Sequence, residues 1–248
     1  DHEVQKLTDS ADGAYAQLMD GGVGCIVRVP ASSGKPDPVP LTFDGAIDIG
    51  LSGHDPRVSG LLLEMTSWTR APKVYAYSPK TGRFVDTGLQ PAGPFDDPPD
   101  LESKEVRVAS HDGTLVPLSI VHRRGLKLDG SHPTWLEAYG AHGYSLEPFF
   151  NPKMLAWLER GGIYAFAHVR GGGEYGEAWH WAGLGPNKPN SWLDLIACAE
   201  YLVARRYTSP ARLAGQGISA GGIAIGRAIT ARPELFAAAI VTVGSANP

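Results

Sequence analysis

The segment GISAGG, from Gly217 to Gly222, places a serine among small residues. An apolar run, ARLAGQ, precedes it, and a second apolar run, IAIGRAITARPELF, follows it directly. A serine hydroxyl becomes an effective nucleophile when a base accepts its proton and fixed donors stabilise the oxyanion that its attack creates. Glycines suit such a segment because a sharp, strained turn leaves little room for side chains. The segment therefore raises the question of which residues supply the base and the donors.

Gly217, Ser219 and Gly221 match the pattern G-x-S-x-G, which joins a buried strand to a helix in α/β hydrolases. In that arrangement Ser219 lies at the helix N-terminus, where the amide of Ala220 and the helix dipole stabilise a developing oxyanion. We therefore predict Ser219 as the nucleophile and Ala220 as one oxyanion donor. Because the pattern is short, a glycine-rich turn without a catalytic role is the alternative interpretation.

The first part of the chain, residues 1–90, has short apolar runs separated by turn residues. Such runs predict antiparallel strands, about seven of them in two rounds, with VYAYSPKTGRFVDTG as the clearest hairpin. This is roughly the content of two four-stranded blades of a β-propeller, whereas a closed ring needs about four to eight blades. The following residues, 91–103, are rich in proline and acidic side chains and predict a linker.

The remaining residues, 104–248, alternate predicted strands with predicted helices. The later strands are apolar almost throughout, which is typical of a parallel sheet covered on both faces. Helices are expected at NPKMLAWLERG and SWLDLIACAEYLVARR, the second opened by a capping box of Ser191 and Asp194. Its predicted core-facing residues are Leu193, Ile196, Ala197, Tyr201 and Leu202. The predicted fold class is therefore an incomplete α/β hydrolase preceded by an all-β segment that resembles the last blades of a propeller.

Composition restricts the possible partners. Among 248 residues, 22 are basic and 26 acidic, without a long run of one sign, which argues against nucleic-acid binding. No apolar run approaches the ~20 residues of a membrane span, and DHEVQKLTDS is not a signal peptide, which leaves a cytoplasmic or a periplasmic location open. Cys25 and Cys198 lack the spacing of a zinc or redox site and are interpreted as two buried thiols. No cofactor or metal is predicted.

Three stretches of the second part carry a family resemblance: GLKLDGSHPTWLEAYG (125–140), VRGGGEYGEAWH (169–180) and YTSPARLAGQGISAGG (207–222). In order and spacing they resemble the prolyl oligopeptidase family of serine peptidases, over nearly all of 103–248. The resemblance implies a β-propeller before the hydrolase domain and short peptides as substrates. No obligate protein partner is evident from the sequence.

The same resemblance implies roles for individual residues. It gives an acyl-enzyme on Ser219, with the amide of Ala220 and the hydroxyl of Tyr139 as the two oxyanion donors. A phenol suits this role because it donates a hydrogen bond while uncharged at neutral pH. An aromatic ring that merely packs at a strand end is the alternative interpretation of Tyr139.

Two departures leave the cleavage preference open. The residues after Tyr139 are GAHGYS, where prolyl-specific members have GGFN, and SAGG replaces SNGG at the elbow. Both changes favour the oligopeptidase B branch, which prefers basic residues, or bacterial relatives of unclear specificity.

The residues after Ser219 lack the remaining partners of a triad. In α/β hydrolases the chain order is serine, acid, histidine, yet after Ser219 the sequence has only one acid, Glu234, and no histidine. We therefore expect a C-terminally truncated fragment that is inactive alone. Among the upstream histidines, His142 and His180 are the two expected near the active face, where a rewired triad could use one as base. Two further alternatives are an esterase, against which the absence of an HGGG motif counts, and a non-catalytic binding protein.

Overall fold

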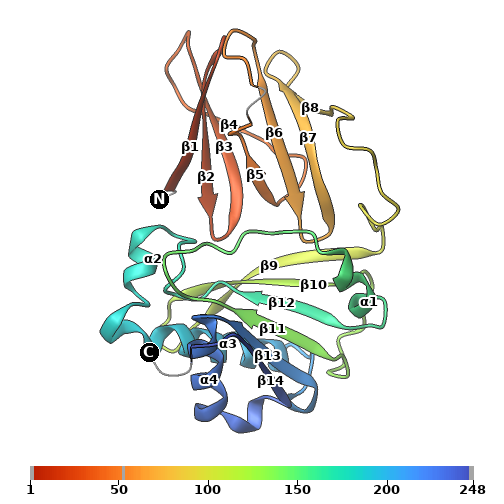
Figure 1. Ribbon diagram of the computed structural model, residues 1–248, viewed down its shortest axis with the longest axis vertical. Helices are drawn as coiled ribbons and strands as arrows, with labels where there is room; N and C mark the ends of the chain where they lie inside the picture. Colours follow the sequence, from red (N-terminus) through yellow and green to blue (C-terminus); the bar gives the residue numbers. More distant parts are fainter. Residues whose placement is uncertain (1–2, 52–53, 246–248) are drawn as a thin grey trace. The chain divides into compact units, whose positions relative to one another are not determined.

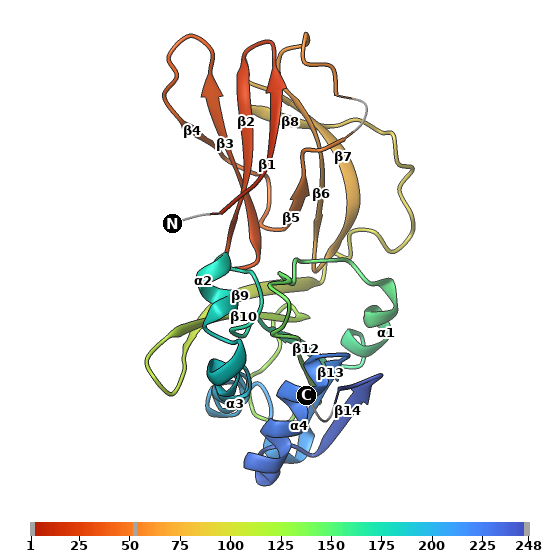
Figure 2. The ribbon, with the colours of Figure 1, turned by 60° about the vertical axis from the view of Figure 1, so that its left-hand side comes forward.

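The computed structural model describes residues 3–51 and 54–245, which form two compact units (Figures 1 and 2). The first unit comprises residues 1–98 together with 147–151, and the second comprises 99–146 together with 152–248. Helices and strands keep the labels of Figure 1. No helix within the described residues is long and apolar enough to cross a membrane.

The first unit contains two antiparallel sheets of four strands each. The first sheet has β1 (Glu3–Ser10), β2 (Gly13–Asp20), β3 (Val23–Pro30) and β4 (Asp37–Val39); the second has β5 (Ala46–Asp48), β6 (Leu61–Ser67), β7 (Arg70–Ser78) and β8 (Arg83–Asp86). This count is one strand more than the roughly seven expected from the sequence. In β1, EVQKLTDS, only two side chains are apolar, so hydrophobic alternation indicates that strand weakly.

One hydrophobic core draws on both sheets of the first unit. Buried and partly buried residues alternate along β6, as expected for a strand with one face on a core. The buried members of this core are Tyr15, Ile26, Val39, Ile47, Ile49, Leu61, Leu63 and Met65. Cys25 in β3 is only half-buried, unlike the buried Cys198 of the second unit, and both are free thiols.

The second unit is built on a six-stranded mixed sheet in the order β14-β13-β11-β12-β10-β9. Its strands are β9 (Leu101–Ala109), β10 (Leu115–Arg123), β11 (Thr134–Ala138), β12 (Ile163–Ala167), β13 (Leu213–Ile218) and β14 (Ala238–Thr242). The strands β12, β11, β13 and β14 are parallel neighbours, while β10 pairs antiparallel with β9 and β12. Every residue of β12 is buried, which explains its apolar sequence, IYAFA.

Four helices of the described residues accompany this sheet: α1 (Leu155–Leu158), α2 (Glu177–Trp181), α3 (Pro189–Ala204) and α4 (Gly221–Ala231). The helix expected at NPKMLAWLERG is shorter than predicted, a 3-10 turn at Pro152–Met154 followed by the single turn of α1. The helix α3 packs on β9, β10 and β12, and α4 packs on β11, β13 and β14.

The predicted start of α3 was wrong. The helix begins at Pro189, before the expected capping residue, because proline has a helical φ and lacks the N–H that a first turn leaves unpaired. Ser191 and Asp194 therefore lie inside the helix, fully buried, and cap nothing. Ser191 instead donates a hydrogen bond to the carbonyl oxygen of Arg170 at 2.6 Å.

The buried side of α3 also differs in part from the predicted stripe. Ile196 and Leu202 are buried as expected, but Leu193, Ala197 and Tyr201 are only partly buried. The other apolar residues that α3 buries are Leu195, Cys198, Ala199. The stripe is rotated toward these residues because Ser191 and Asp194 face buried polar partners on the same side.

Candidate active site

Ser219 lies in the turn between β13 and α4, as the strand-turn-helix pattern predicted, and this placement is confirmed. Its φ of 51° lies in the left-handed region, which is unfavourable for a residue with a side chain and is characteristic of strained functional turns. A Cβ added at Gly217 would lie 2.2 Å from the carbonyl oxygen of Gly221. The turn therefore requires glycine at this position, and Ser219 itself is exposed.

Hydrogen bonds from the end of β14 hold the turn. The amide of Ser219 donates to the carbonyl of Thr242 at 2.9 Å, and the amide of Ser245 donates to the carbonyl of Ser219 at 2.9 Å. The amide of Ala220, by contrast, has no acceptor within the described part of the chain. An amide that is fixed by the fold but unpaired has the property required of an oxyanion donor.

Tyr139 directly follows β11, the parallel neighbour of β13. Because Ala138 pairs with Gly217, Tyr139 and the turn at Ser219 leave the sheet at the same edge, where parallel sheets place their ligands. A Cβ added at Gly221 would lie 3.3 Å from Cα of Tyr139, so the two segments are in close contact. The direction of the Tyr139 hydroxyl toward the oxyanion position stays a prediction.

Two cavities open beside these residues within the second unit. The smaller, of about 280 Å³, is lined by Glu137, Ala138, Tyr139, Tyr144, Leu146 and Ile218. The larger, of about 560 Å³, is lined by Ala141, His142, His180, Gly183, Leu184, Gly185, Lys188, Ala220 and Ile223. Tyr139 belongs to the first cavity and Ala220 to the second. The structure therefore brings His142 and His180 to the cavity that adjoins Ala220.

The electrostatics of the two cavities differ. Burial raises the pKa of Glu137 in the smaller cavity, against the effect of hydrogen bonds from Tyr164, at 3.0 Å, and from Gln216. Burial lowers the pKa of Lys188 in the larger cavity. The smaller cavity thus has an acid that resists ionisation, and the larger has a cation that burial destabilises.

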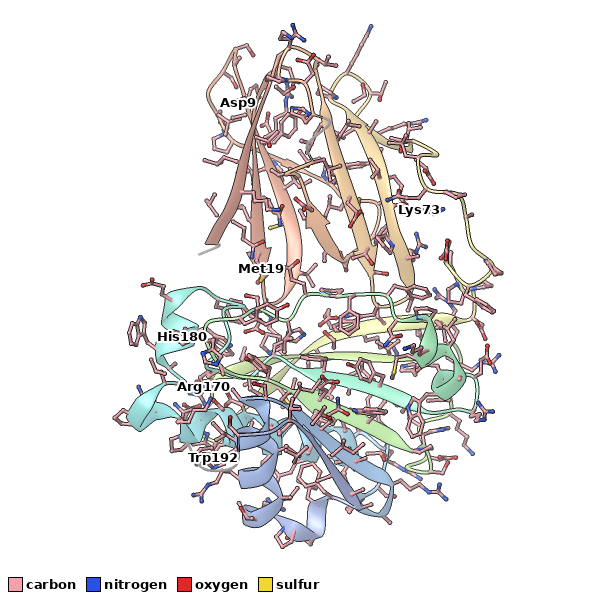
Figure 3. The ribbon with its side chains drawn as sticks, in the orientation of Figure 1. Asp9, Met19, Lys73, Arg170, His180 and Trp192 are labelled. Carbon is pink, nitrogen blue, oxygen red and sulfur yellow. The ribbon has the colours of Figure 1, made fainter. Side chains whose placement is uncertain are left out.

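The loops that shape the larger cavity are held by polar groups that the sequence analysis did not identify. Lys188 Nζ donates to the carbonyl oxygen of Gly140 at 2.5 Å, in the loop after Tyr139. A carboxylate oxygen of Glu174 accepts from the amide of Leu146 at 3.1 Å, at the other end of that loop. His180 belongs to α2 and is labelled in Figure 3, and its Nδ1 donates to the carbonyl oxygen of Gly171 at 3.0 Å.

Arg170 is buried and forms the centre of an ion-pair network with the buried Asp194 and the exposed Asp112. Its backbone amide, Nε and one terminal nitrogen donate to the carboxylate of Asp194, at 2.6 to 3.0 Å. Its other terminal nitrogen donates to Asp112 at 2.6 Å, and the hydroxyl of Ser110 donates to Asp194. Glu174 and Arg170 both lie in RGGGEYGE, so the resemblance of that stretch was the available signal for a structural role.

Comparison with known proteins identifies the family. Residues 148–248 match the prolyl oligopeptidase family. A prolyl endopeptidase of Elizabethkingia meningoseptica is 38% identical over 192 residues, which are 77% of this chain and 27% of that protein. A prolyl endopeptidase of Elizabethkingia miricola is 38% identical over 204 residues, which are 82% of this chain and 29% of that protein.

This chain belongs to the prolyl oligopeptidase family. Its structure is similar, with a TM-score of 0.82 and 35% identity, to one from a study of two prolyl endopeptidases, covering 98% of this chain and 35% of that one. It is also similar to oligopeptidase B of Trypanosoma brucei with covalently bound antipain, with a TM-score of 0.81, 30% identity and coverage of 97% and 35%. The fold class expected from the sequence, an α/β hydrolase sheet preceded by propeller-like strands, is confirmed. The chain spans 27% to 29% of the length of the two curated relatives named above.

Proposed function

We propose that this member of the prolyl oligopeptidase family contributes the nucleophile and the oxyanion donors of a serine-type peptidase that hydrolyses short peptides. The observation that carries the proposal is the strained turn at Ser219, between β13 and α4, with the unpaired amide of Ala220 beside it. The relatives named prolyl endopeptidase and the T. brucei enzyme with covalently bound antipain support the same chemistry.

The proposed reaction proceeds through an acyl-enzyme. A base takes the proton of the Ser219 hydroxyl while Oγ attacks the peptide carbonyl carbon, and the negative charge on the carbonyl oxygen is stabilised by the Ala220 amide and the Tyr139 hydroxyl. The C–N bond then breaks, the amine leaves with a proton, and water hydrolyses the ester on Ser219. Loss of one oxyanion donor typically lowers kcat by ~100-fold to 1000-fold, so Tyr139→Phe is expected to lower turnover by about that factor.

We further propose that the 248-residue chain does not complete this reaction by itself. After Ser219 its only acid, Glu234, is exposed and paired with Arg232 at 2.5 Å, and its sequence has no histidine there. Without a base the serine stays mostly a protonated alcohol, a poor nucleophile. The first unit, with its two four-stranded sheets, is proposed as two propeller blades (1–90), followed by a linker (91–103) and the hydrolase part (104–248).

Labelling with a fluorophosphonate probe tests the function. The chain alone is expected to label slowly, and a longer product that carries an acid and a histidine after Ser219 is expected to label rapidly and to cleave short peptides. Ser219→Ala should abolish both. Rapid, Ser219-dependent labelling by the chain alone would show instead that His142 or His180 serves as base, and His142→Ala and His180→Ala would identify which. Rapid hydrolysis of esters without peptides would favour an esterase, and an unreactive long product would favour a binding protein.

A panel of short peptides tests the cleavage preference. Peptides with proline, arginine or an apolar residue before the scissile bond separate the prolyl specificity of the curated relatives from that of oligopeptidase B. This chain departs from the prolyl-specific pattern after Tyr139 and at Ala220. Its cleavage preference therefore has to be measured on this chain and is not taken from its relatives.

A further inference from the structure

The larger cavity contains a half-buried cation without an anionic partner. Lys188 lines this cavity together with Ala220, the residue after the proposed nucleophile. Its ammonium group donates to the carbonyl oxygen of Gly140 at 2.5 Å and to the hydroxyl of Ser191 at 3.2 Å, both neutral acceptors. Within the described residues no carboxylate forms an ion pair with it. An ammonium group has three N–H donors, so one donor is left for a further acceptor.

The other groups that line the cavity favour an anion. His142 is exposed, and its ring can offer an N–H donor. The half-buried His180 already donates from Nδ1 to the carbonyl oxygen of Gly171. The described lining residues include no aspartate or glutamate, and the rest of the lining is apolar or glycine. A cation in such surroundings has lost hydration without gaining a counter-charge, which makes binding of an anion favourable.

We propose that this cavity binds a carboxylate of the peptide substrate, held by the ammonium group of Lys188 beside the scissile bond. The proposal rests on the proposed function, because Ala220 places the cavity next to the nucleophile. The carboxylate belongs either to an acidic side chain or to the free C-terminus of a short peptide, since both present the same group. Lys188 is then a specificity-determining residue.

The smaller cavity provides an internal contrast. It is lined by Tyr139, Tyr144, Leu146 and Glu137, and burial raises the pKa of Glu137 and so disfavours its ionised form. A carboxylate there would meet an acid and two phenols, without a cationic side chain among the described lining residues. The two cavities beside the turn at Ser219 therefore select different substrate groups, and among the described lining residues only those of the larger cavity include a lysine.

Reversible binding to the 248-residue chain carrying Ser219→Ala tests the proposal without requiring any chemical step. The probes are four acetylated tripeptides, Ala-Ala-X, measured by calorimetry. X is glutamine amide, glutamate amide, glutamine with a free C-terminal carboxylate, or lysine amide. At least one of the two carboxylate peptides is expected to bind about tenfold more tightly than the neutral peptide, the factor that one charge-assisted hydrogen bond typically supplies. Whichever of the two binds more tightly identifies the source of the carboxylate.

Variants of Lys188 show whether the preference arises in this cavity. Lys188→Gln is expected to remove it, and Lys188→Arg is expected to retain most of it. Lys127→Gln, an exposed lysine outside the cavity, is the matched control and should retain the full preference. The preference should also decrease with added salt, as screening of a partly exposed charge requires.

Several results would overturn the proposal. These are equal binding of the carboxylate and neutral peptides, tighter binding of the lysine peptide, a carboxylate preference that survives Lys188→Gln, and no binding of any probe at millimolar concentration. The proposed function is judged separately, by Ser219-dependent labelling of the longer product. If the longer product labels but the chain shows no carboxylate preference, the proposed peptidase function stands and the proposed specificity is wrong. If the chain shows the preference but the longer product does not label, carboxylate binding stands and the proposed peptidase function is wrong.

Discussion

In each unit of the molecule an aspartate far from its arginine in the sequence gathers several donors, and the two clusters differ in what they hold. In the first unit Asp12, in the β1–β2 turn, accepts from Arg28 Nε at 2.7 Å, from Tyr15 at 2.9 Å and from the amide of Gly60 at 2.6 Å. In the second unit Asp194, on α3, accepts from the backbone and the guanidinium of Arg170. The first cluster ties hairpin ends together, and the second holds loops around the proposed active site.

The clusters also differ in burial, and this difference predicts their energetics. The Asp12 and Arg28 side chains are 14% and 22% exposed, whereas those of Asp194 and Arg170 are 0% and 5% exposed. An ion pair near solvent loses one partner at moderate cost, because water replaces the missing group. A fully buried pair that loses one partner leaves an uncompensated charge in a poorly polarisable interior. The comparison indicates that the burial of an ion pair, more than its number of hydrogen bonds, determines how much stability is lost when one partner is removed.

The largest expected effect is that of Asp194→Ala, which should lower the free energy of unfolding of the second unit by about 3–5 kcal/mol. The reason is that the Arg170 guanidinium keeps only Asp112 as an anionic partner. Hydrogen exchange of β11 and β12, measured by mass spectrometry, reports the stability of the second unit separately from that of the first. Unchanged protection of the amides in those strands would show that the burial of an ion pair does not determine how much stability its loss costs.

A smaller effect is expected from Asp12→Ala, about 2 kcal/mol in the first unit, because several donors lose an acceptor in a partly solvated site. Exchange should increase in β2 and β3 and remain unchanged in β11 and β12. A loss as large as that of Asp194→Ala would break the comparison between the clusters.

The dependence of the first unit's stability on pH tests the role of Asp12 further. Burial alone would raise the pKa of Asp12, but hydrogen bonds from Gly60, Ser10, Tyr15 and Ser59 hold it far below its usual range. A carboxylate with a depressed pKa stabilises the fold fully above its unfolded pKa of about 3.9, and this contribution is lost as pH falls toward the folded value. The first unit should therefore lose stability below about pH 4. Asp12→Asn should flatten this part of the curve in urea unfolding followed at Trp68, the only tryptophan of the first unit. A slope unchanged in that variant would assign the acid response to other carboxylates.

The smallest effect is expected at an exposed pair. Arg232 forms ion pairs with Glu200 and Glu234 on the surface of the second unit, with side chains 40% to 63% exposed. Glu200→Ala should change the free energy of unfolding by less than about 0.5 kcal/mol, since solvent screens such pairs. A destabilisation above 2 kcal/mol would show that the number of ion pairs matters as much as their depth.

The features that the sequence predicted well are local in the chain. The turn at Ser219 could be predicted because its glycines, strand and helix are contiguous in the sequence, and the same holds for the position of Tyr139 at a strand end. The role of Asp194 could not, since its partner Arg170 lies 24 residues away and Ser110 lies 84 residues away. Local pattern assigned Ser191 to a cap because a capping box and a buried polar contact use the same residue types. Lys188 was missed for the same reason, because only the folded loops bring it to Ala220.

The hydrogen bonds between Ser219 and the end of β14 have a consequence for the synthesis of the protein. A serine in the left-handed region costs roughly 1–2 kcal/mol, and this cost is offset by contacts from Thr242 and Ser245, which follow it in the chain. Both contacts come from residues that are synthesised after α4, so the turn lacks them until residue 245 has left the ribosome. We therefore expect the turn that carries Ser219 to take its final conformation only after β14, the last strand of the described residues, has been synthesised.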